Sequence, residues 1–354
     1  MVCIESKKLG SSYPCFIIAE AGVNHNGDVS LAKRLIDEAS NSGADAVKFQ
    51  IFNAGNIVTI NAEKAGYQKK SESQSSTQYE MLKKLELTNK EFRILSDYAK
   101  EKGLVFLATP FDVESIDFLD EIGVSAFKIS SGEINNNTLL KYVAHKQKPI
   151  ILSTGMSTLC DVENALRVIE GEGNLDIILL HCVSDYPAEV KDVNLRAMDT
   201  LRHAFGYLVG YSDHSIGITI PIAAVSLGAC IIEKHFTLDK NLPGPDHKAS
   251  LEPDELKMMI KGIREIEIAM GTGIKKPSQS EIENKKAIRR SIVAAKDIPE
   301  HTIITSELVT TKRPGTGISA ENLPMVIGTR TRRHIKKDEI LAWTDVIDTN
   351  HAGE

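Results

Sequence analysis

The sequence predicts an α/β protein, a (β/α)8 TIM barrel followed by a small and mostly β unit. Three observations lead to this prediction. Eight short apolar runs rich in β-branched residues recur up to about residue 270, and amphipathic segments of helical period lie between them. Polar residues able to do chemistry follow each run at once. Beyond a polar stretch, the pattern changes to short runs separated by turns.

The eight apolar runs are the expected strands of one sheet. In chain order they are Phe16–Glu20, Ala46–Gln50, Val105–Pro110, Ala126–Ser130, Ile150–Thr154, Ile177–His181, Val209–His214 and Cys230–His235. Strands that alternate with helices favour a parallel sheet, whose carboxyl ends all meet at one rim. An open doubly wound sheet is the alternative. Catalytic residue types at every strand end suit the rim of a barrel better than a single crevice.

Helix signals fill the intervals between the expected strands. Asp28 is the expected N-cap of a first helix that closes near Gly43, and Thr88 and Glu91 form a capping box for a later one. Further amphipathic segments are 112–123, 157–171, 218–228 and 252–271. The polar segment 61–78 is too long for an ordinary connection and too polar for a core, so we expect a loop over the strand ends there.

The predicted domain boundary lies after the last barrel helix. The stretch from Gly271 to Lys286 is polar and carries Gly and Pro, the composition of a linker. The resulting division is a catalytic barrel (1–275), a linker (276–285) and a C-terminal domain (286–354). About 70 residues is near the lower size at which a domain folds well alone, so we expect the C-terminal domain to dock on something.

Composition excludes several classes of partner. The 354-residue chain has a formal net charge of −6 and no long basic run, which argues against nucleic acid but leaves room for a local basic pocket. Its five cysteines are typical of small buried thiols in a reducing compartment, not of a disulfide framework. No stretch approaches the roughly 18 apolar residues of a spanning helix, and no secretory signal is present. We expect a cytoplasmic protein without a membrane partner.

Two histidines end the seventh and eighth expected strands. Adjacent parallel strands lie about 4.8 Å apart, so His214 and His235 at matching depths could share one divalent ion. No Cys-x-x-Cys pair exists to complete a closed zinc site, so such an ion would keep positions open for water and a substrate carbonyl. The alternative is that each is a rim histidine with its own hydrogen bonds, because most histidines bind no metal.

Lys48 and Lys128 lie within the second and fourth expected strands, although lysine is rarely buried without a partner. An anion entering at the rim is the expected partner. Hydroxyl groups at neighbouring strand ends would add a cradle for phosphate or carboxylate: Thr109, Ser130, Ser131, Ser153 and Ser212. Each hydroxyl could equally cap a helix. Glu20 and Glu133 are candidate acids or bases, with ordinary structural carboxylates as the alternative.

Eleven short motifs lie in order along nearly the whole chain, many of them at strand ends. They are Asn24-His-Asn-Gly27, Val47-Lys-Phe-Gln50, Thr109-Pro-Phe111, Phe127-Lys-Ile-Ser-Ser-Gly-Glu133, Ser153-Thr-Gly-Met156, His181-Cys182, Tyr186-Pro187, Ser212-Asp-His214, Glu233-Lys-His-Phe236, Pro243-Gly-Pro-Asp-His247 and Lys312-Arg-Pro-Gly315. Together they resemble the sialic acid (N-acetylneuraminate) synthase family, which includes legionaminate and pseudaminate synthases. Any one motif is weak, but eleven in register are highly specific.

The resemblance implies a TIM barrel followed by an antifreeze-like (SAF) domain, assembled as a domain-swapped homodimer. It implies that phosphoenolpyruvate is joined to an open-chain N-acetylmannosamine-type sugar, with Mn²⁺ or Mg²⁺ bound by His214 and His235. Positions matching the family's phosphoenolpyruvate contacts are Lys48, Thr109, Lys128, Ser131, Ser153, Ser184 and Ser212, where Ser184 replaces an Asn of some members. Positions matching its sugar contacts are Glu20, Gln50, Tyr186, Asp246 and Arg313, the last contributed by a partner subunit.

The implied reaction assigns chemistry to these residues. C3 of phosphoenolpyruvate is a weak nucleophile, so a metal on the aldehyde oxygen would act as the Lewis acid. Water then adds at C2 and phosphate leaves by C–O cleavage, with Glu133 as the candidate acid or base for the proton transfers.

The prediction is an N-acetylneuraminate synthase, and the alternative is a legionaminate or pseudaminate synthase acting on a diacetamido-trideoxyhexose. A carbohydrate- or ice-binding protein is a further alternative, but its flat, uncharged threonine rows are absent from the tail.

Overall fold

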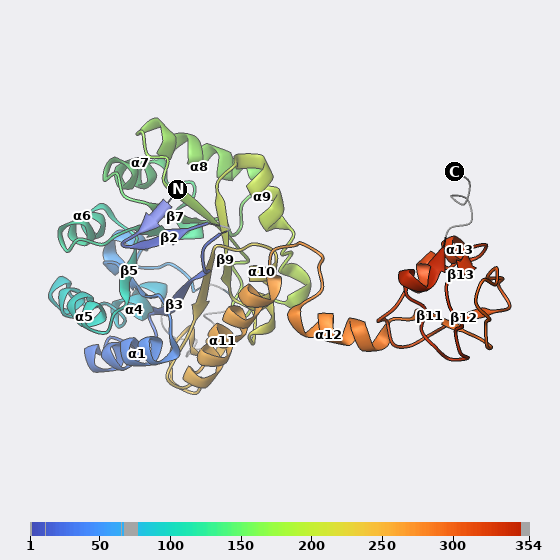
Figure 1. Cartoon of the computed structure of the whole chain (residues 1–354). Coiled ribbons are helices and arrows are strands. Elements are labelled where there is room, and N and C mark those ends of the chain that lie inside the picture. Colours follow the sequence, from blue (N-terminus) through green and yellow to red (C-terminus); the bar gives the residue numbers. More distant parts are fainter. Residues whose placement is uncertain (1, 11, 65, 67–76, 348–354) are drawn as a thin grey trace. The chain divides into compact units, whose positions relative to one another are not determined.

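The structure, a computed structural model, describes residues 2–10, 12–64, 66 and 77–347. These residues form two compact units, Met1–Gly271 and Thr272–Glu354 (Figure 1). Residues 67–76, most of the segment expected to form a loop over the strand ends, lie outside the described residues, so that loop stays a prediction.

An eight-stranded parallel sheet forms the centre of the first unit. Its strands are β3 (Phe16–Gly22), β4 (Ala46–Ile51), β5 (Val105–Pro110), β6 (Phe127–Ile129), β7 (Ile150–Ser153), β8 (Ile177–Cys182), β9 (Leu208–Asp213) and β10 (Ile231–His235). The hydrogen-bonded order is β5-β4-β3-β10-β9-β8-β7-β6, and the two end strands are neighbours in space. The sheet is therefore a nearly closed barrel, which confirms the predicted fold class over the doubly wound alternative.

Helices surround the barrel (Figure 1). They are α1 (Val29–Ser42), α5 (Asn89–Glu101), α6 (Val113–Glu121), α7 (Asn137–His145), α8 (Leu159–Gly171), α9 (Ala197–Phe205), α10 (Thr219–Ser226) and α11 (Pro253–Met270), with the short α2 (Ala54–Ile57) and α4 (Gln78–Lys83). The predicted start signals are present, since Asp28 accepts a hydrogen bond from Ser30 N and Thr88 and Glu91 form a capping box. No helix among the described residues is long and apolar enough to cross a membrane.

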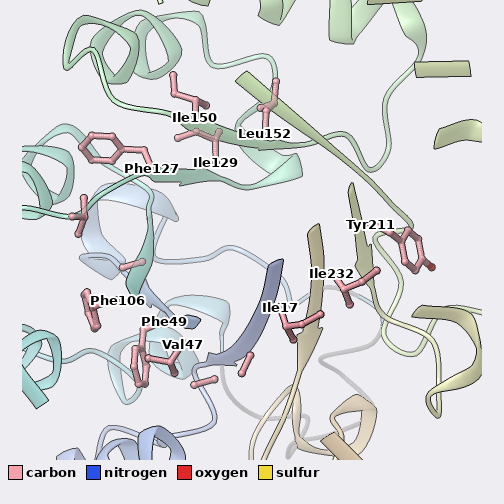
Figure 2. Close-up of a cluster of buried hydrophobic side chains, with 14 of the residues drawn as sticks. Ile17, Val47, Phe49, Phe106, Phe127, Ile129, Ile150, Leu152, Tyr211 and Ile232 are labelled. Carbon is pink, nitrogen blue, oxygen red and sulfur yellow. The ribbon is translucent and has the colours of Figure 1, made fainter. Parts of the chain in front are cut away.

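The period-two alternation of each strand divides its side chains between two environments. One set faces the helices and forms the larger hydrophobic core, part of which Figure 2 shows: Ile17, Val47, Phe49, Phe106, Phe127, Ile129, Ile150, Leu152, Tyr211 and Ile232. The intervening residues face the barrel interior. They are apolar near the amino ends of the strands, as at Ile18 and Ile151, and polar near the carboxyl ends, as at Lys48 and Lys128.

An N-terminal hairpin closes the amino end of the barrel interior. Strands β1 (Val2–Ile4) and β2 (Lys7–Leu9) pair in antiparallel fashion. Val2, Ile4 and Leu9 are buried in one cluster with interior residues such as Phe16 and Ile231. This apolar cluster fills the amino end of the barrel interior, opposite the rim where the strands end in polar residues.

The second unit is small and built from short β-elements. Strands β11 (Ser291–Ala294) and β12 (Val309–Lys312) pair in antiparallel fashion, as do β13 (Arg330–Thr331) and β14 (Val346–Ile347), and α13 (Leu323–Val326) lies between these pairs in sequence. A separate hydrophobic core holds the unit together, with Ile292, Ile304 and Leu341 fully buried.

Part of the expected linker is helical. Residues Gln279–Ile288 form α12, which opens with a capping box between Ser278 and Glu281. Every side chain of this helix is exposed. A helix that buries no face has no apolar stripe, which is why its composition indicated a linker. The predicted division at 275 and 286 stays a prediction beside the observed division after Gly271.

Candidate active site

A cavity of about 470 Å³ opens at the carboxyl ends of the barrel strands. Of the fifteen side chains predicted for the site, twelve line it: Glu20, Lys48, Gln50, Thr109, Lys128, Ser131, Ser153, Ser184, Tyr186, Ser212, His214 and His235. Glu20 on β3 and His235 on β10, the first and last strands of the barrel in sequence, share this surface because the two strands are paired in the sheet. Lys48 on β4 and Ser212 on β9 also face its interior. The structure therefore brings together most of the set that the resemblance implied.

Two lysines and two glutamates form a buried network of alternating charge in the cavity. Lys48 Nζ lies 2.8 Å from Glu20 Oε2 and 3.7 Å from Glu233 Oε2, and Lys128 Nζ lies 3.3 Å from Glu233 Oε1. All four side chains are at most 5% exposed. Buried charges are tolerated when they are paired, so the network explains how two lysines can lie inside a barrel.

The four groups differ in pKa because their surroundings differ. Burial alone would lower the pKa of both lysines, but the carboxylates of Glu20 and Glu233 raise that of Lys48, whereas Lys128 keeps a lowered pKa. Burial raises the pKa of Glu20 despite the ammonium of Lys48. For Glu233, burial is outweighed by Lys128 and Lys48, which hold its pKa well below its usual range. Of the two glutamates, Glu233 is therefore the one whose ionised form is favoured.

Hydroxyl groups surround the lysines. Lys48 donates to Thr109 Oγ1 at 3.0 Å, and Ser212 donates to Glu233 Oε1 at 2.8 Å. Ser131 Oγ accepts a hydrogen bond of 2.9 Å from Gly155 N and lies 3.2 Å from Cys182 Sγ. Ser130 also lines the cavity, and its buried hydroxyl has no partner among the described residues. Hydroxyls beside two ammonium groups are suited to hold phosphate and carboxylate oxygens.

Gly155 keeps the hydroxyl groups close together. A Cβ on this residue would lie 2.3 Å from Ser184 Oγ and 2.8 Å from Ser131 Oγ. Any larger residue would therefore displace both hydroxyls, because real Cβ contacts are not this short. Ser184, which replaces an Asn of some family members, thus reaches the same corner of the cavity as Ser131.

His214 and His235 face each other across the rim. Their ring centroids are 5.6 Å apart, and the ring of Tyr186 lies 4.1 Å from that of His214. Burial lowers the pKa of His214 to about 4 and that of His235 further, so both imidazoles are neutral at pH 7. Neutral imidazole is the form that binds a metal.

The histidine pair fits a divalent ion with open coordination positions. His214 Nδ1–H donates to the carbonyl of Val183 at 2.6 Å, which sets the tautomer and leaves the lone pair on Nε2, 3.5 Å from Ser212 Oγ. His235 Nδ1 is buried and has no hydrogen-bond partner within the part of the chain that the structure describes. Among the described residues, no group of three His, Cys, Asp or Glu side chains converges as a closed metal site. Two protein ligands would leave the remaining positions to water and substrate.

Comparisons with known proteins agree with this site. The family model "NeuB family" matches residues 35–275, and the "SAF domain" model matches residues 289–347. The chain is 53% identical over 327 residues to an N,N'-diacetyllegionaminic acid synthase of Campylobacter jejuni, covering 92% of this chain and 98% of that protein. It is 48% identical to the synthase of the same name from Legionella pneumophila, covering 96% and 97%.

A solved structure agrees as well. The N-acetylneuraminic acid synthetase of Leptospira borgpetersenii, crystallised with citrate, is 40% identical with a TM-score of 0.71, covering 80% of this chain and 94% of that one. The chain belongs to the NeuB family. The expected enzyme class, a nonulosonic acid synthase, is thereby confirmed, and so is the expected SAF domain.

Three predicted site residues of this NeuB chain do not line the cavity. Glu133 ends the short 3-10 helix Ser131–Glu133, and its Oε2 accepts a hydrogen bond of 2.7 Å from Asn136 Nδ2. Asp246 is buried, with Oδ2 3.9 Å from His235 Nδ1. Arg313 belongs to the second unit, directly after β12. Their roles stay predictions.

Glu233 is the principal residue of the NeuB cavity to which sequence reasoning assigned no role. It stands two positions before His235 on β10, so period-two alternation directs both side chains to the barrel interior. The sequence feature that could have revealed it is an acidic residue within an apolar strand, two positions before a candidate metal ligand. Lys234, between them, faces outward and pairs at 2.6 Å with Asp213.

Proposed function

We propose that this enzyme joins phosphoenolpyruvate to the open-chain form of a diacetamido-trideoxyhexose, giving a legionaminate-type nonulosonic acid and phosphate. The observation that carries this proposal is the cavity in which Lys48 and Lys128, ringed by hydroxyls, lie next to two neutral histidines. A small molecule with two anionic groups fits the lysine side. A carbonyl-bearing sugar fits the histidine side.

The choice of sugar follows from the relatives. N-Acetylneuraminate synthesis, the first prediction, is supported only at the level of the family. Proteins named N,N'-diacetyllegionaminic acid synthases are 53% and 48% identical over nearly the whole chain, whereas the N-acetylneuraminic acid synthetase of known structure is 40% identical over a smaller share. The legionaminate alternative is therefore the one we propose.

The side chains of the cavity bind and orient the two substrates. Lys48, Lys128 and the hydroxyls of Thr109, Ser131, Ser153 and Ser212 would hold the phosphate and carboxylate of phosphoenolpyruvate. Glu20 and Gln50, joined by a hydrogen bond of 3.3 Å, are placed to contact hydroxyl or amide groups of the sugar. The bond forms between C3 of phosphoenolpyruvate and the aldehyde carbon, water adds at C2, and phosphate departs with its bridging oxygen.

A divalent ion, Mn²⁺ or Mg²⁺, bound by His214 and His235 would supply Lewis acidity to the sugar aldehyde. Burial raises the pKa of Glu20, so this carboxyl group could accept and release a proton within the cavity during the reaction. Glu133, the residue expected for this task, would first have to leave its hydrogen bond with Asn136.

The proposal includes a dimer in which the SAF domain serves a partner's barrel. Arg313 lies in the motif Lys312-Arg-Pro-Gly315 of the second unit, and family resemblance implies a sugar contact in trans. Such an arrangement would give the small domain the docking surface that its size calls for.

A sugar panel tests the proposed function. Purified enzyme with phosphoenolpyruvate and Mn²⁺ is offered N-acetylmannosamine, the legionaminate-type diacetamido-trideoxyhexose and its pseudaminate-type isomer, and phosphate release is followed. We expect the highest kcat/KM for the legionaminate-type sugar and loss of turnover on chelation. A preference for N-acetylmannosamine would restore the first prediction, and full activity after chelation would overturn the metal assignment.

A further inference from the structure

The segment that follows β10 returns to the place where it began. Phe236 N donates to the carbonyl of Glu20 at 3.0 Å, and Leu251 N donates to the carbonyl of His235 at 2.9 Å. Phe236 and Leu251 form an isolated parallel bridge. Residues 237–250, here called the return loop, therefore start and end beside a candidate metal ligand and carry Asp246 between them.

Asn24 connects this loop to the first strand of the barrel. Its side chain is 2% exposed, and Nδ2 donates to the carbonyl of Phe236 at 2.8 Å and to Ser250 Oγ at 2.9 Å. Ser250 Oγ in turn donates to the carbonyl of Asp246 at 2.7 Å. A single buried amide thus holds both the start of the return loop and, through one hydroxyl, the backbone of Asp246.

A second set of contacts fixes the loop to the same segment. His247, fully buried, lies 2.7 Å from Thr237 Oγ1 through Nδ1 and 3.2 Å from Asn26 Oδ1 through Nε2. Gly244 packs onto this pair: a Cβ there would lie 2.7 Å from His247 Cδ2 and 2.9 Å from Asn26 Oδ1. The return loop is therefore seated on residues 24–26 at two separate points.

The carboxyl group of Asp246 has no comparable support of its own. Among the described residues, no hydrogen bond holds its carboxyl oxygens. Oδ2 lies 3.9 Å from His235 Nδ1, and the charges of Glu20 and Lys48 also act on this carboxyl group. Its backbone carbonyl is held by Ser250 Oγ and by Ala249 N at 3.2 Å. The position of this carboxyl group is consequently set by its backbone, and so by Asn24 and Ser250.

We propose that Asn24 is a positioning residue for sugar binding, acting through Ser250 on Asp246. The proposal rests on the proposed function, in which Asp246 contacts the sugar. Asn24 itself does not line the cavity, so it touches neither substrate. Its loss should loosen the sugar side of the site and leave the lysine side, where phosphoenolpyruvate binds, as it is.

Steady-state kinetics of four enzymes test this. Wild type, Asn24→Ala, Ser250→Ala and the double variant are assayed with the sugar that wild type uses best, and KM is measured for each substrate. We expect Asn24→Ala to raise the KM for the sugar about tenfold, the equivalent of one or two hydrogen bonds, and to change that for phosphoenolpyruvate less than about twofold. Ser250→Ala should raise the sugar KM less, and the double variant no more than Asn24→Ala, because both break one chain of contacts.

Asn174→Ala is the matched control. Asn174 is equally buried, and its amide likewise donates to backbone carbonyls, of Lys148 at 2.8 Å and Ala144 at 3.5 Å, but it precedes β8 at the opposite end of the barrel. Its removal should lower the melting temperature without changing either KM. Asn24→Ala behaving in the same way would overturn the proposal, as would additive effects of Asn24→Ala and Ser250→Ala.

Two further outcomes are distinguishable. If Asn24→Ala does not fold, a folded Ser250→Ala with an unchanged sugar KM still overturns the proposal, and a raised one supports it. An Asp246→Asn variant with an unchanged sugar KM would overturn the role of Asp246 and this proposal together, while turnover by wild type would leave the proposed reaction standing.

Discussion

Glu233 shows how one buried carboxylate can organise an anion site. It lies within 3.7 Å of both cavity lysines and accepts a hydrogen bond from the hydroxyl of Ser212, so it orients three groups expected to bind phosphoenolpyruvate. Those two lysines also hold its pKa well below the usual range, so its ionised form is favoured at neutral pH. We expect its role to be to hold the two lysines in place before an anionic substrate binds.

Replacement of Glu233 by Gln tests this role. The amide keeps the shape but removes the shared negative charge, so Lys48 and Lys128 repel each other and Ser212 loses a strong acceptor. Breaking a buried pair in this way costs about 3 kcal/mol or more of unfolding free energy. We expect the rate of phosphate release to fall about a hundredfold, because the side chains that bind phosphoenolpyruvate would be misplaced.

The control is Glu172→Gln, which removes a carboxylate paired with Lys141 outside the cavity. This variant should leave the unfolding free energy and the rate of phosphate release nearly unchanged. Equal effects of the two variants would contradict the role assigned to Glu233.

His25 supplies a test of pH dependence away from the histidine pair. It is fully buried, its Nδ1 accepts a hydrogen bond of 3.0 Å from Gly27 N, and burial lowers its pKa to about 4. Its contribution to stability is complete above the unfolded pKa of about 6.5 and is lost as the pH falls from there to about 4, because the unfolded chain binds the proton first.

We therefore expect His25→Asn to reduce the pH dependence of stability. The difference between the unfolding free energies at pH 7.5 and pH 5.0 should be about 2 kcal/mol smaller in the variant than in wild type. Urea denaturation at the two pH values measures this, and the comparison of differences removes any constant loss caused by the substitution itself. Identical differences in the two proteins would show that His25 does not titrate in this way.

At the scale of elements, the N-terminal hairpin and the rim have separate tasks. The hairpin β1–β2 fills the amino end of the barrel interior with Val2, Ile4 and Leu9, whereas substrates are expected at the carboxyl end. The apolar layers of the interior lie between the two. Stability and activity should therefore respond to different substitutions along the same strands.

Ile4→Ala is expected to lower the unfolding free energy by about 2–5 kcal/mol, because Ile4 is fully buried and its loss leaves a cavity. At temperatures where the variant is folded, kcat/KM should equal that of wild type. Thermal denaturation and phosphate release measure the two quantities. Cys3→Ala, on the exposed face of the same strand, is the control and should be close to neutral for both. A large loss of kcat/KM in folded Ile4→Ala would show that the hairpin shapes the site.

At the scale of the whole molecule, the chain is two units with separate hydrophobic cores. The barrel contains the complete charge network and the histidine pair, and the second unit has its own buried cluster around Ile292 and Leu341. Arg313 is the one predicted site residue that lies in the second unit. Whether it serves its own chain or a partner depends on assembly, which a subunit-exchange experiment measures directly.

The experiment mixes two inactive variants, Lys128→Met and Arg313→Ala. If Arg313 acts in trans, one active site of each mixed dimer receives both wild-type residues and the other receives neither. We expect recovery of up to about half of the wild-type activity per mixed dimer. Mass measurement of the intact dimers is the control for exchange. Mixed dimers that recover no activity would place Arg313 in the site of its own chain or in the fold alone.

The sequence alone determined the eight barrel strands, six of the helices around them (α1, α5, α6, α8, α10 and α11) and most of the cavity lining. Strand and helix periods are local signals, and in a parallel barrel every strand must deliver its last residues to one rim. Lys48, Lys128, His214 and His235 could therefore be placed together without coordinates. Helix α12 was missed because an exposed helix has no apolar face to reveal it.

Only the tertiary structure decided which side chains meet. The contacts of Glu233 with both lysines, the support of Asp246 by Asn24 through Ser250, and the hairpin plug at the amino end join residues from distant parts of the chain. The hydrogen bond from Asn136 to Glu133, whose role stays a prediction, is likewise visible only in the structure. Such contacts depend on barrel closure, strand register and loop path, which arise from packing of the whole chain and leave no periodic signal in the sequence.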